Sequence, residues 1–225
     1  VGSNIIGEIK RDPIATDFII TLAGAAFMAP EKPPVLDPSP KSQNINLDRS
    51  FFENLPPMDR ICFLCQTDND LKKLIGKNNF DILRFFILAN KAQLITLKKE
   101  TKTSIDVDGF QFLVTSVSPE SELIFREKKE KFGVKWLWHG SDTTRWYRIL
   151  HTGLKDMGKT EYELNGGPWF GNGIYMSDSF QYSLSYCRSA ENIYAHSMLP
   201  KTLYVISLVE NADVKELTGP VAQNE

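Results

Sequence analysis

The amino-acid sequence predicts an α+β protein in which a helical bundle precedes a domain of short strands and helices. Residues 1–91 carry apolar side chains at helical spacing between proline-bearing turns. Beyond residue 91 the pattern changes to short β-branched and aromatic runs that alternate with helical segments. We therefore expect a helical regulatory domain over 1–91 and a second, strand-rich domain over 92–225.

The helical domain contains one strongly apolar helix. Its apolar run, 18–28, is shorter than the roughly 20 residues that a membrane span needs, so it indicates a buried core helix. Prolines over 30–40 end this helix and predict an extended connection. Further helices are expected at 59–66, 68–75 and 79–89.

The second domain is expected to start with two strands and a charged helix. The runs 93–98 and 110–117 are rich in β-branched and aromatic residues, with a turn at 106–109 between them. Pro119 then opens a helix that Gly133 ends. Because this helix carries charges of both signs, it indicates a solvated face rather than a nucleic-acid patch.

Strands and helices alternate after Gly133. We expect strands at 134–139, 173–177 and 202–210, and helices at 143–151 and 179–187. The strands are short and irregular segments separate them, which favours an α+β domain over a doubly wound sheet. No closing element follows the last strand, so we expect the domain to be incomplete at its C-terminus.

Charge and cysteine content limit the classes of partner and compartment. The 225 residues include 26 Lys+Arg and 28 Asp+Glu, a net charge of −2, which excludes a global basic field for nucleic acid or an anionic membrane. Cys62, Cys65 and Cys187 are too few for a secreted disulfide scaffold and indicate a cytoplasmic or nuclear protein. Cys62 and Cys65 lack a second pair of ligands, so we expect no metal site.

The first cluster with chemical potential is Lys-Trp-Leu-Trp-His-Gly-Ser at 135–141. A histidine at a strand end, His139, can face a ligand, and Gly140 lets a ligand approach its backbone N–H and C=O. Taken alone, however, a single histidine is more often a structural residue whose polar atoms are satisfied by its neighbours.

The second cluster spans 166–187, where glycines precede a strand and an aromatic helix. These glycines fit neither the Gly-x-Gly-x-x-Gly fingerprint of Rossmann folds nor a P-loop, which excludes both nucleotide motifs. Ser183 and Tyr186 share a helix face and Tyr175 comes from the adjoining strand, so two aromatic planes and a hydroxyl can bracket a flat ligand. Core packing explains the same pattern equally well.

Together, the two clusters closely resemble the catalytic core of the poly(ADP-ribose) polymerase superfamily. The resemblance covers about residues 134–210 and rests on Leu-Trp-His-Gly-Ser at 137–141, Phe-Gly-Asn-Gly-Ile-Tyr-Met-Ser-Asp at 170–178, and Ser183 with the Tyr-Cys that ends at 187. The helical part resembles mono-ADP-ribosyltransferases that carry a helical domain before the transferase, such as the endoplasmic-reticulum tail-anchored member and the fungal members fused to a ubiquitin-conjugating domain. The fold implied for residues 92–225 is the split β-sheet of ADP-ribosyltransferases.

The resemblance implies NAD as the ADP-ribose donor and assigns roles to individual residues. His139 would hydrogen-bond the adenosine ribose, and the backbone of Gly140 would read the nicotinamide carboxamide. Ser183 would add its hydroxyl to that amide, while Tyr175 and Tyr186 would sandwich the pyridinium ring. The implied catalytic residues are His139 and Tyr175, and the implied NAD-binding residues are His139, Gly140, Ser141, Tyr175, Ser183 and Tyr186.

Three neighbouring positions complete this picture. Ser141 would lie near the ribose and cap the next helix, and 155–169 corresponds to the family's variable loop over the donor site. Arg145 stands where some members place an Asn near the adenine, so this chain departs from the family there. The third residue of the catalytic triad, which separates polymer from monomer chemistry, would lie beyond Glu225.

The implied function is NAD-dependent ADP-ribosyl transfer to protein side chains, with release of nicotinamide and without a metal. The helical part favours mono-ADP-ribosylation of protein acceptors, including the protein itself, by a monomer that binds no nucleic acid. Only a C-terminal tail outside this chain would attach it to a membrane, on the cytosolic face of the endoplasmic reticulum. Two alternatives stay open: a catalytically inactive module that binds NAD or ADP-ribose or scaffolds a partner, and hydrolysis of NAD with water as the acceptor.

Overall fold

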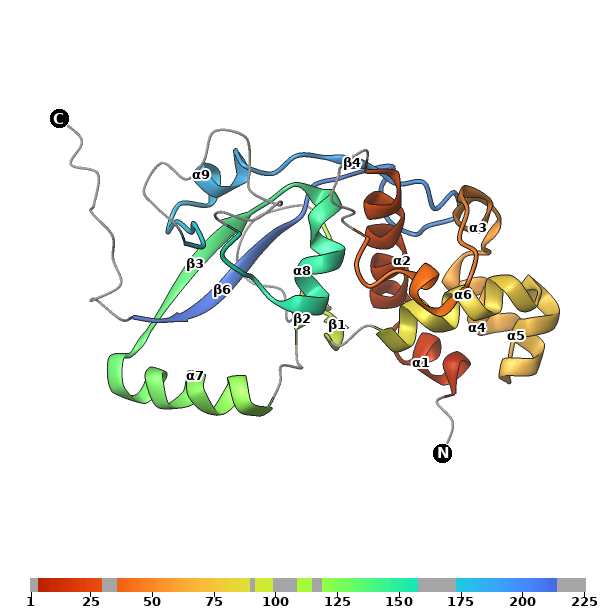
Figure 1. Cartoon of the computed structure of the whole chain (residues 1–225), viewed down its shortest axis with the longest axis horizontal. Coiled ribbons are helices and arrows are strands. Elements are labelled where there is room, and N and C mark those ends of the chain that lie inside the picture. The colour runs from red at the N-terminus through yellow and green to blue at the C-terminus, as the bar shows by residue number, and fades with distance from the viewer. Residues whose placement is uncertain are drawn as a thin grey trace.

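The computed structural model describes residues 4–29, 36–89, 92–98, 109–114, 119–157 and 173–213. Most of the described helices gather at one end (Figure 1). The other end holds the long ribbon of β3 (Val134–Gly140) and β6 (Ile206–Ala212), with the helices α7 (Pro119–Phe132) and α9 (Phe180–Leu184). The predicted mixture of helices and strands is confirmed. The proline-rich connection, the turn at 106–109 and the loop at 155–169 fall largely outside the described residues.

In the residues that the structure describes, the helical end contains six α-helices and one 3₁₀ turn. In order they are α1 (Ile5–Arg11), α2 (Pro13–Met28), η1 (Pro40–Gln43), α3 (Arg49–Asn54), α4 (Met58–Leu64), α5 (Asp68–Ile75) and α6 (Lys77–Ala89). Local capping explains several boundaries. Asp12 caps α2 by accepting from Ala15 N–H at 2.9 Å, and Pro13 takes the first helical position. Thr67 and Asp70 form a reciprocal capping box on α5.

Helix α2 is the centre of the core. Twelve of its residues, from Ala15 to Ala26, are buried, which confirms the predicted core helix. Phe51, Phe52 and Phe86 pack against one another with ring centroids 5.1–6.3 Å apart. The same core continues into the second half of the chain through Tyr147, which meets Phe86 edge to face.

The described strands form three antiparallel pairs. They are β1 (Leu94–Thr96) with β2 (Phe112–Val114), β3 (Val134–Gly140) with β6 (Ile206–Ala212), and β4 (Ala190–Glu191) with β5 (Thr202–Leu203). The β3–β6 pair runs in register from Val134 opposite Ala212 to Gly140 opposite Ile206. Helix α7 (Pro119–Phe132) leads into β3 through Gly133, whose φ of 78° suits a glycine. The larger split sheet stays a prediction.

Several expected elements are shorter in the structure. The strand expected at 173–177 is reduced to one bridge, in which Trp138 and Ser177 exchange N–H···O bonds of 2.7 and 3.0 Å. The strand expected at 202–210 is divided into β5 and β6. The helix expected at 143–151 is divided into the 3₁₀ turn η2 (Thr143–Arg145) and α8 (Trp146–Thr152). The helix expected at 179–187 is the shorter α9 (Phe180–Leu184).

The segment between β4 and β5 binds the helical end to the rest of the molecule. Asp17, fully buried in α2, accepts hydrogen bonds from the Ser197 hydroxyl and from Met198 N–H, the latter at 2.9 Å. The Tyr194 hydroxyl donates to the carbonyl of Pro56 at 2.6 Å. Burial raises the pKa of Asp17, while these hydrogen bonds lower it in part. One core therefore underlies both halves of the chain.

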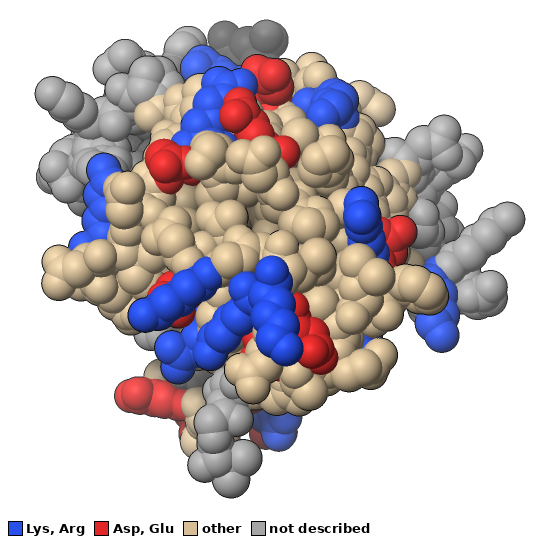
Figure 2. All heavy atoms as spheres, turned by 90° about the vertical axis from the view of Figure 1, so that its right-hand side faces the viewer, with Lys and Arg blue, Asp and Glu red and all other residues tan. Residues whose placement is uncertain are grey.

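The surface of the helical end carries charges of both signs. Figure 2 shows Lys and Arg beside Asp and Glu around an uncharged area on this face. Within the described ranges, no helix has both the length and the apolarity to cross a bilayer.

Candidate active site

The candidate site forms where β3 ends and two later segments meet it. The carbonyl of Trp138 accepts two hydrogen bonds, from Ser177 N–H at 3.0 Å and from the Ser183 hydroxyl at 3.0 Å. These bonds hold the 173–177 stretch and α9 against the same strand. The structure thus joins the two sequence clusters at one place, although thirty-six positions separate His139 from Tyr175.

His139 is fixed by a bond from its ring to the chain. Its Nδ1 lies 2.9 Å from the carbonyl oxygen of Tyr175, and its ring meets Trp146 with centroids 6.1 Å apart. Since a carbonyl can only accept, Nδ1 carries the proton and Nε2 keeps its lone pair. Burial lowers the pKa of His139 below its ordinary 6.5, and the Tyr175 bond offsets this only in part. The imidazole is therefore neutral at pH 7.

Gly140 presents its backbone at the edge of the β3–β6 pair. Trp138 directs its N–H and C=O toward Ser177, so alternation along the strand directs those of Gly140 to the same side, away from β6. Within the described part of the chain, no hydrogen bond occupies them. One donor and one acceptor of a single residue thus face the same way.

A side chain at position 140 would collide with α9. A Cβ atom there would lie 1.9 Å from the carbonyl oxygen of Ser183 and 3.0 Å from Sγ of Cys187. The glycine is therefore needed for the close approach of helix and strand, in addition to any contact with a ligand. Cys187 is buried and its Sγ contacts the carbonyl of Val205 at 3.2 Å, so it is a packed thiol.

Three tyrosines lie partly exposed beside this strand end. Tyr175 is 44% exposed, Tyr186 56% and Tyr182 54%, so each has ring surface available to a ligand. The hydroxyls of Tyr182 and Tyr186 lie 3.0 Å apart, and this bond raises the pKa of Tyr186. The sandwich of a flat ring between Tyr175 and Tyr186 stays a prediction.

One sequence-based expectation about Ser141 is wrong. Asp142, and not Ser141, caps the following 3₁₀ turn, because its carboxylate accepts from Thr144 N–H at 3.0 Å and from the Thr144 hydroxyl at 2.7 Å. A carboxylate one residue nearer the turn reaches the free N–H groups that the Ser141 hydroxyl was expected to satisfy. The place of Ser141 near a ribose stays a prediction. Arg145 ends the turn directly before α8.

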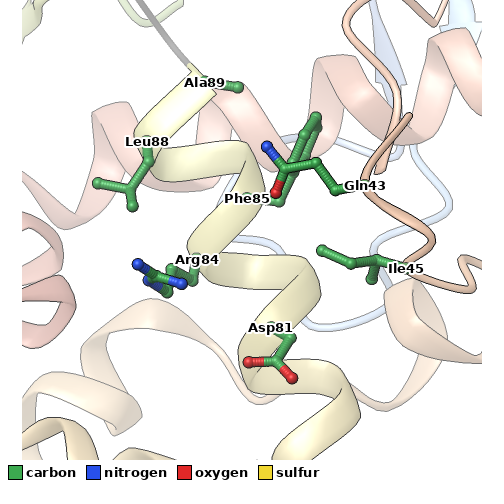
Figure 3. Close-up of a pocket in the computed structure, with 7 residues that line it drawn as sticks. All are labelled: Gln43, Ile45, Asp81, Arg84, Phe85, Leu88 and Ala89. Atoms are coloured by element: carbon green, nitrogen blue, oxygen red, sulfur yellow. The ribbon is translucent and has the colours of Figure 1, made fainter. Parts of the chain in front are cut away.

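Features outside this site offer less chemistry. Among the described residues, no group of three metal-binding side chains occurs, and burial raises the pKa of both Cys62 and Cys65. The expectation that no metal binds stays a prediction. A hollow of about 440 Å³ lies in the helical end between η1 and α6, and its lining includes Asp81, Arg84 and Phe85 (Figure 3). None of the residues predicted for NAD binding lines it.

The geometry defines a class of site, and comparison with known proteins gives the family. The site combines a neutral histidine at a strand end, an open glycine backbone and a serine-bearing helix with exposed tyrosines. This is the arrangement expected of an ADP-ribosyltransferase donor site. Residues 93–222, more than half of the chain, match the model of the poly(ADP-ribose) polymerase catalytic domain. The chain belongs to this family, and the resemblance seen in the sequence is confirmed.

Individual relatives match over different lengths. Protein mono-ADP-ribosyltransferase PARP8 of Mus musculus is 26% identical over 195 residues, which are 80% of this chain and 23% of that protein. Protein mono-ADP-ribosyltransferase PARP16 of Mus musculus is 25% identical over 214 residues, 91% of this chain and 64% of that protein. Poly [ADP-ribose] polymerase 2-A of Oryza sativa subsp. japonica is 35% identical over 105 residues, 45% of this chain and 15% of that protein. The chain therefore spans less than two thirds of these relatives.

Two residues near the site were not found by sequence reasoning. Asp142 precedes two threonines, a pattern typical of a capped turn. Tyr182 stands four positions before Tyr186, a spacing that brings side chains together on a helix. Both signals are present in the sequence.

Proposed function

We propose that the protein is an NAD-dependent ADP-ribosyltransferase that attaches single ADP-ribose units to protein side chains and releases nicotinamide. The observation that carries the proposal is the bond between His139 Nδ1 and the Tyr175 carbonyl, beside the open backbone edge of Gly140. The names of two relatives, both mono-ADP-ribosyltransferases, support single transfer over chain elongation.

The nicotinamide end would be recognised by complementary hydrogen bonds. The N–H of Gly140 would donate to the carboxamide oxygen, and the C=O of Gly140 would accept from its NH₂ group. Ser183 already donates its proton to Trp138, so its oxygen is left as a second acceptor for the same NH₂ group. The exposed faces of Tyr175 and Tyr186 would attract the cationic ring by about 0.5 to 2 kcal/mol.

The adenosine end would be held by His139. Because Nε2 keeps its lone pair, it would accept a hydrogen bond from a hydroxyl of the adenosine ribose. Trp146, packed edge-on against the imidazole, supports this ring orientation. Protonation of Nε2 would remove the acceptor, so the neutral state that burial favours is also the state that would bind.

The reaction would break one bond and form another at the anomeric carbon of the nicotinamide ribose. The C–N bond would cleave with its electron pair moving to the pyridinium nitrogen, so nicotinamide would leave uncharged. The acceptor side chain would then attack the oxocarbenium-like sugar and lose its proton. Holding the donor by both ends would contribute mainly through orientation, because the cation is lost as the bond breaks.

We also propose the division of the chain into a helical domain over 1–91 and a transferase domain over 92–225, since the family match begins at residue 93. The transferase would act as a monomer on protein acceptors, itself included, without nucleic acid or metal. A cytoplasmic or nuclear location, or the cytosolic face of the endoplasmic reticulum, belongs to the same proposal.

Labelled NAD tests this function directly. We expect the full-length protein to transfer label to protein and to release nicotinamide, and His139→Ala to lower the rate at least tenfold. His196→Ala is the matched control, because His196 is an exposed histidine in the β4–β5 segment. NAD binding without nicotinamide release would instead support the inactive binding module, and free ADP-ribose as the only product would show hydrolysis. Label transfer that His139→Ala leaves unchanged would refute the assigned site.

A further inference from the structure

Tyr182 lies beside the residues assigned to NAD binding and has no role in the reaction as proposed. Its ring packs against that of Tyr186 with centroids 5.4 Å apart and planes inclined by 66°. Its hydroxyl lies 3.0 Å from the Tyr186 hydroxyl. The two tyrosine rings thus meet edge to face, and their hydroxyls are hydrogen-bonded to each other.

The backbone of Tyr182 is held more firmly than that of Tyr186. The N–H of Tyr182 donates to the hydroxyl of Ser179, the residue that caps α9, at 3.2 Å. Its carbonyl accepts from the hydroxyl of Ser185 at 2.6 Å and from Ser185 N–H at 3.2 Å. Because α9 spans only Phe180–Leu184, Tyr182 stands at its centre.

Tyr186 stands beyond the end of the helix. It lies two positions after Leu184, and its N–H makes a single turn bond of 3.2 Å to the carbonyl of Ser183. Tyr186 is 56% exposed, close to the 54% of Tyr182, so the two residues differ in how their backbones are held and not in their exposure. A ring in this position can sample several rotamers unless a neighbour fixes it.

We infer that Tyr182 is a positioning residue, which holds the ring of Tyr186 in the orientation that stacks on the nicotinamide of NAD. This inference rests on the proposed function. A ring that is already oriented loses less conformational freedom when NAD binds, so the benefit falls on donor affinity. Tyr182 need not touch the donor, because it acts through the paired hydroxyls and the edge-on ring contact.

The substitution Tyr182→Phe keeps the ring and removes only the hydroxyl. In the full-length protein, we expect it to raise KM for NAD three- to tenfold and to change kcat less than twofold. Affinity for 3-aminobenzamide, a small mimic of the nicotinamide end, is expected to fall by the same factor. Tyr204→Phe is the matched control, because it removes the hydroxyl of a tyrosine that is 63% exposed and lies outside α9; it should change neither quantity.

A double-mutant cycle separates positioning from a general structural effect. If Tyr182 acts through the hydroxyl pair, then adding Tyr182→Phe to Tyr186→Phe should raise KM no further. NMR of ring-labelled tyrosine provides a readout that does not depend on turnover: Tyr182→Phe should broaden or shift the Tyr186 ring signals, and Tyr204→Phe should not.

Two outcomes would overturn the inference in distinguishable ways. An active enzyme with an unchanged KM in Tyr182→Phe, or with additive effects in the double variant, would refute the positioning role and leave the proposed function intact. A wild-type protein that neither binds NAD nor releases nicotinamide would refute the proposed function, and the positioning role would fall with it.

Discussion

The substitution Gly140→Ala tests the close approach of α9 to β3. The new Cβ would lie 1.9 Å from the Ser183 carbonyl oxygen, and real Cβ atoms essentially never come within 3.0 Å of another heavy atom. The backbones of α9 and β3 must therefore separate by about 1.1 Å at this contact, and a shift of α9 away from β3 by that distance breaks the 3.0 Å bond between Ser183 and Trp138. Overpacking costs about 1–3 kcal/mol and the lost bond about 1 kcal/mol.

The predicted consequence is a loss of both stability and turnover. A destabilisation of about 2–4 kcal/mol corresponds to a fall in Tm of roughly 10 °C for a chain of this size. A displacement of about 1 Å at the nicotinamide end is expected to lower the rate of nicotinamide release about 100-fold. Calorimetric melting and a nicotinamide-release assay measure the two effects on the same full-length protein.

Gly76→Ala is the matched control for this experiment. Gly76 has a φ of 81° in the helical end, and a Cβ there would meet no atom within 4 Å. With a φ of 81° and a ψ of 158°, a backbone conformation that is essentially limited to glycine, strain alone should cost about 1–3 kcal/mol and leave turnover unchanged. A Gly140→Ala enzyme that melts and turns over like the wild type would refute the close approach that the structure describes.

Three further predictions follow from other contacts of the described residues. Burial lowers the pKa of His139 below 6.5, so its imidazole protonates only as the pH falls through that lowered value. KM for NAD should therefore be flat above pH 6.5 and rise below it. A rise of KM on the alkaline side instead would contradict the role of the neutral imidazole as an acceptor. Asp17→Ala leaves the Ser197 hydroxyl and the Met198 N–H without their buried acceptor. We therefore expect a loss of about 3 kcal/mol in unfolding free energy, measured by urea titration. An unchanged midpoint of the urea transition would contradict this prediction. Ser183→Ala removes one hydrogen bond to Trp138 and one expected hydrogen bond to the carboxamide of NAD. The unfolding free energy should fall by about 1 kcal/mol, and KM for NAD should rise about fivefold. An effect on kcat alone would argue against a role of Ser183 in binding.

The sequence predicted local structure well because local residues determine it. The capping box of Thr67 and Asp70 marks the start of α5, and Gly76 marks its end. The apolar composition of α2 likewise indicated a helix that is buried on every side. Boundaries that depend on distant partners were predicted less well, as for the 173–177 stretch, whose pairing stops after the Trp138–Ser177 bridge.

The candidate site was only partly accessible to sequence reasoning. His139 and Gly140 could be found because a strand end places them beside a ligand. The bond from His139 to the Tyr175 carbonyl could not be found, since a backbone acceptor leaves no mark in residue type. Asp17 shows the same limit: a carboxylate within an apolar helix indicates a buried partner, but nothing local identifies Ser197, 180 positions away.

The β4–β5 segment can couple ligand binding at the candidate site to the stability of the helical end. Ala195 donates its N–H to the carbonyl of Phe52 in α3, and this segment begins shortly after Cys187, which packs on the strand end. Binding of NAD at the proposed donor site should therefore slow hydrogen exchange of the β4–β5 segment and of α3 together. Conversely, a protein that binds α3 should change donor affinity without contacting the proposed donor site, through thermodynamic linkage that includes this hydrogen bond.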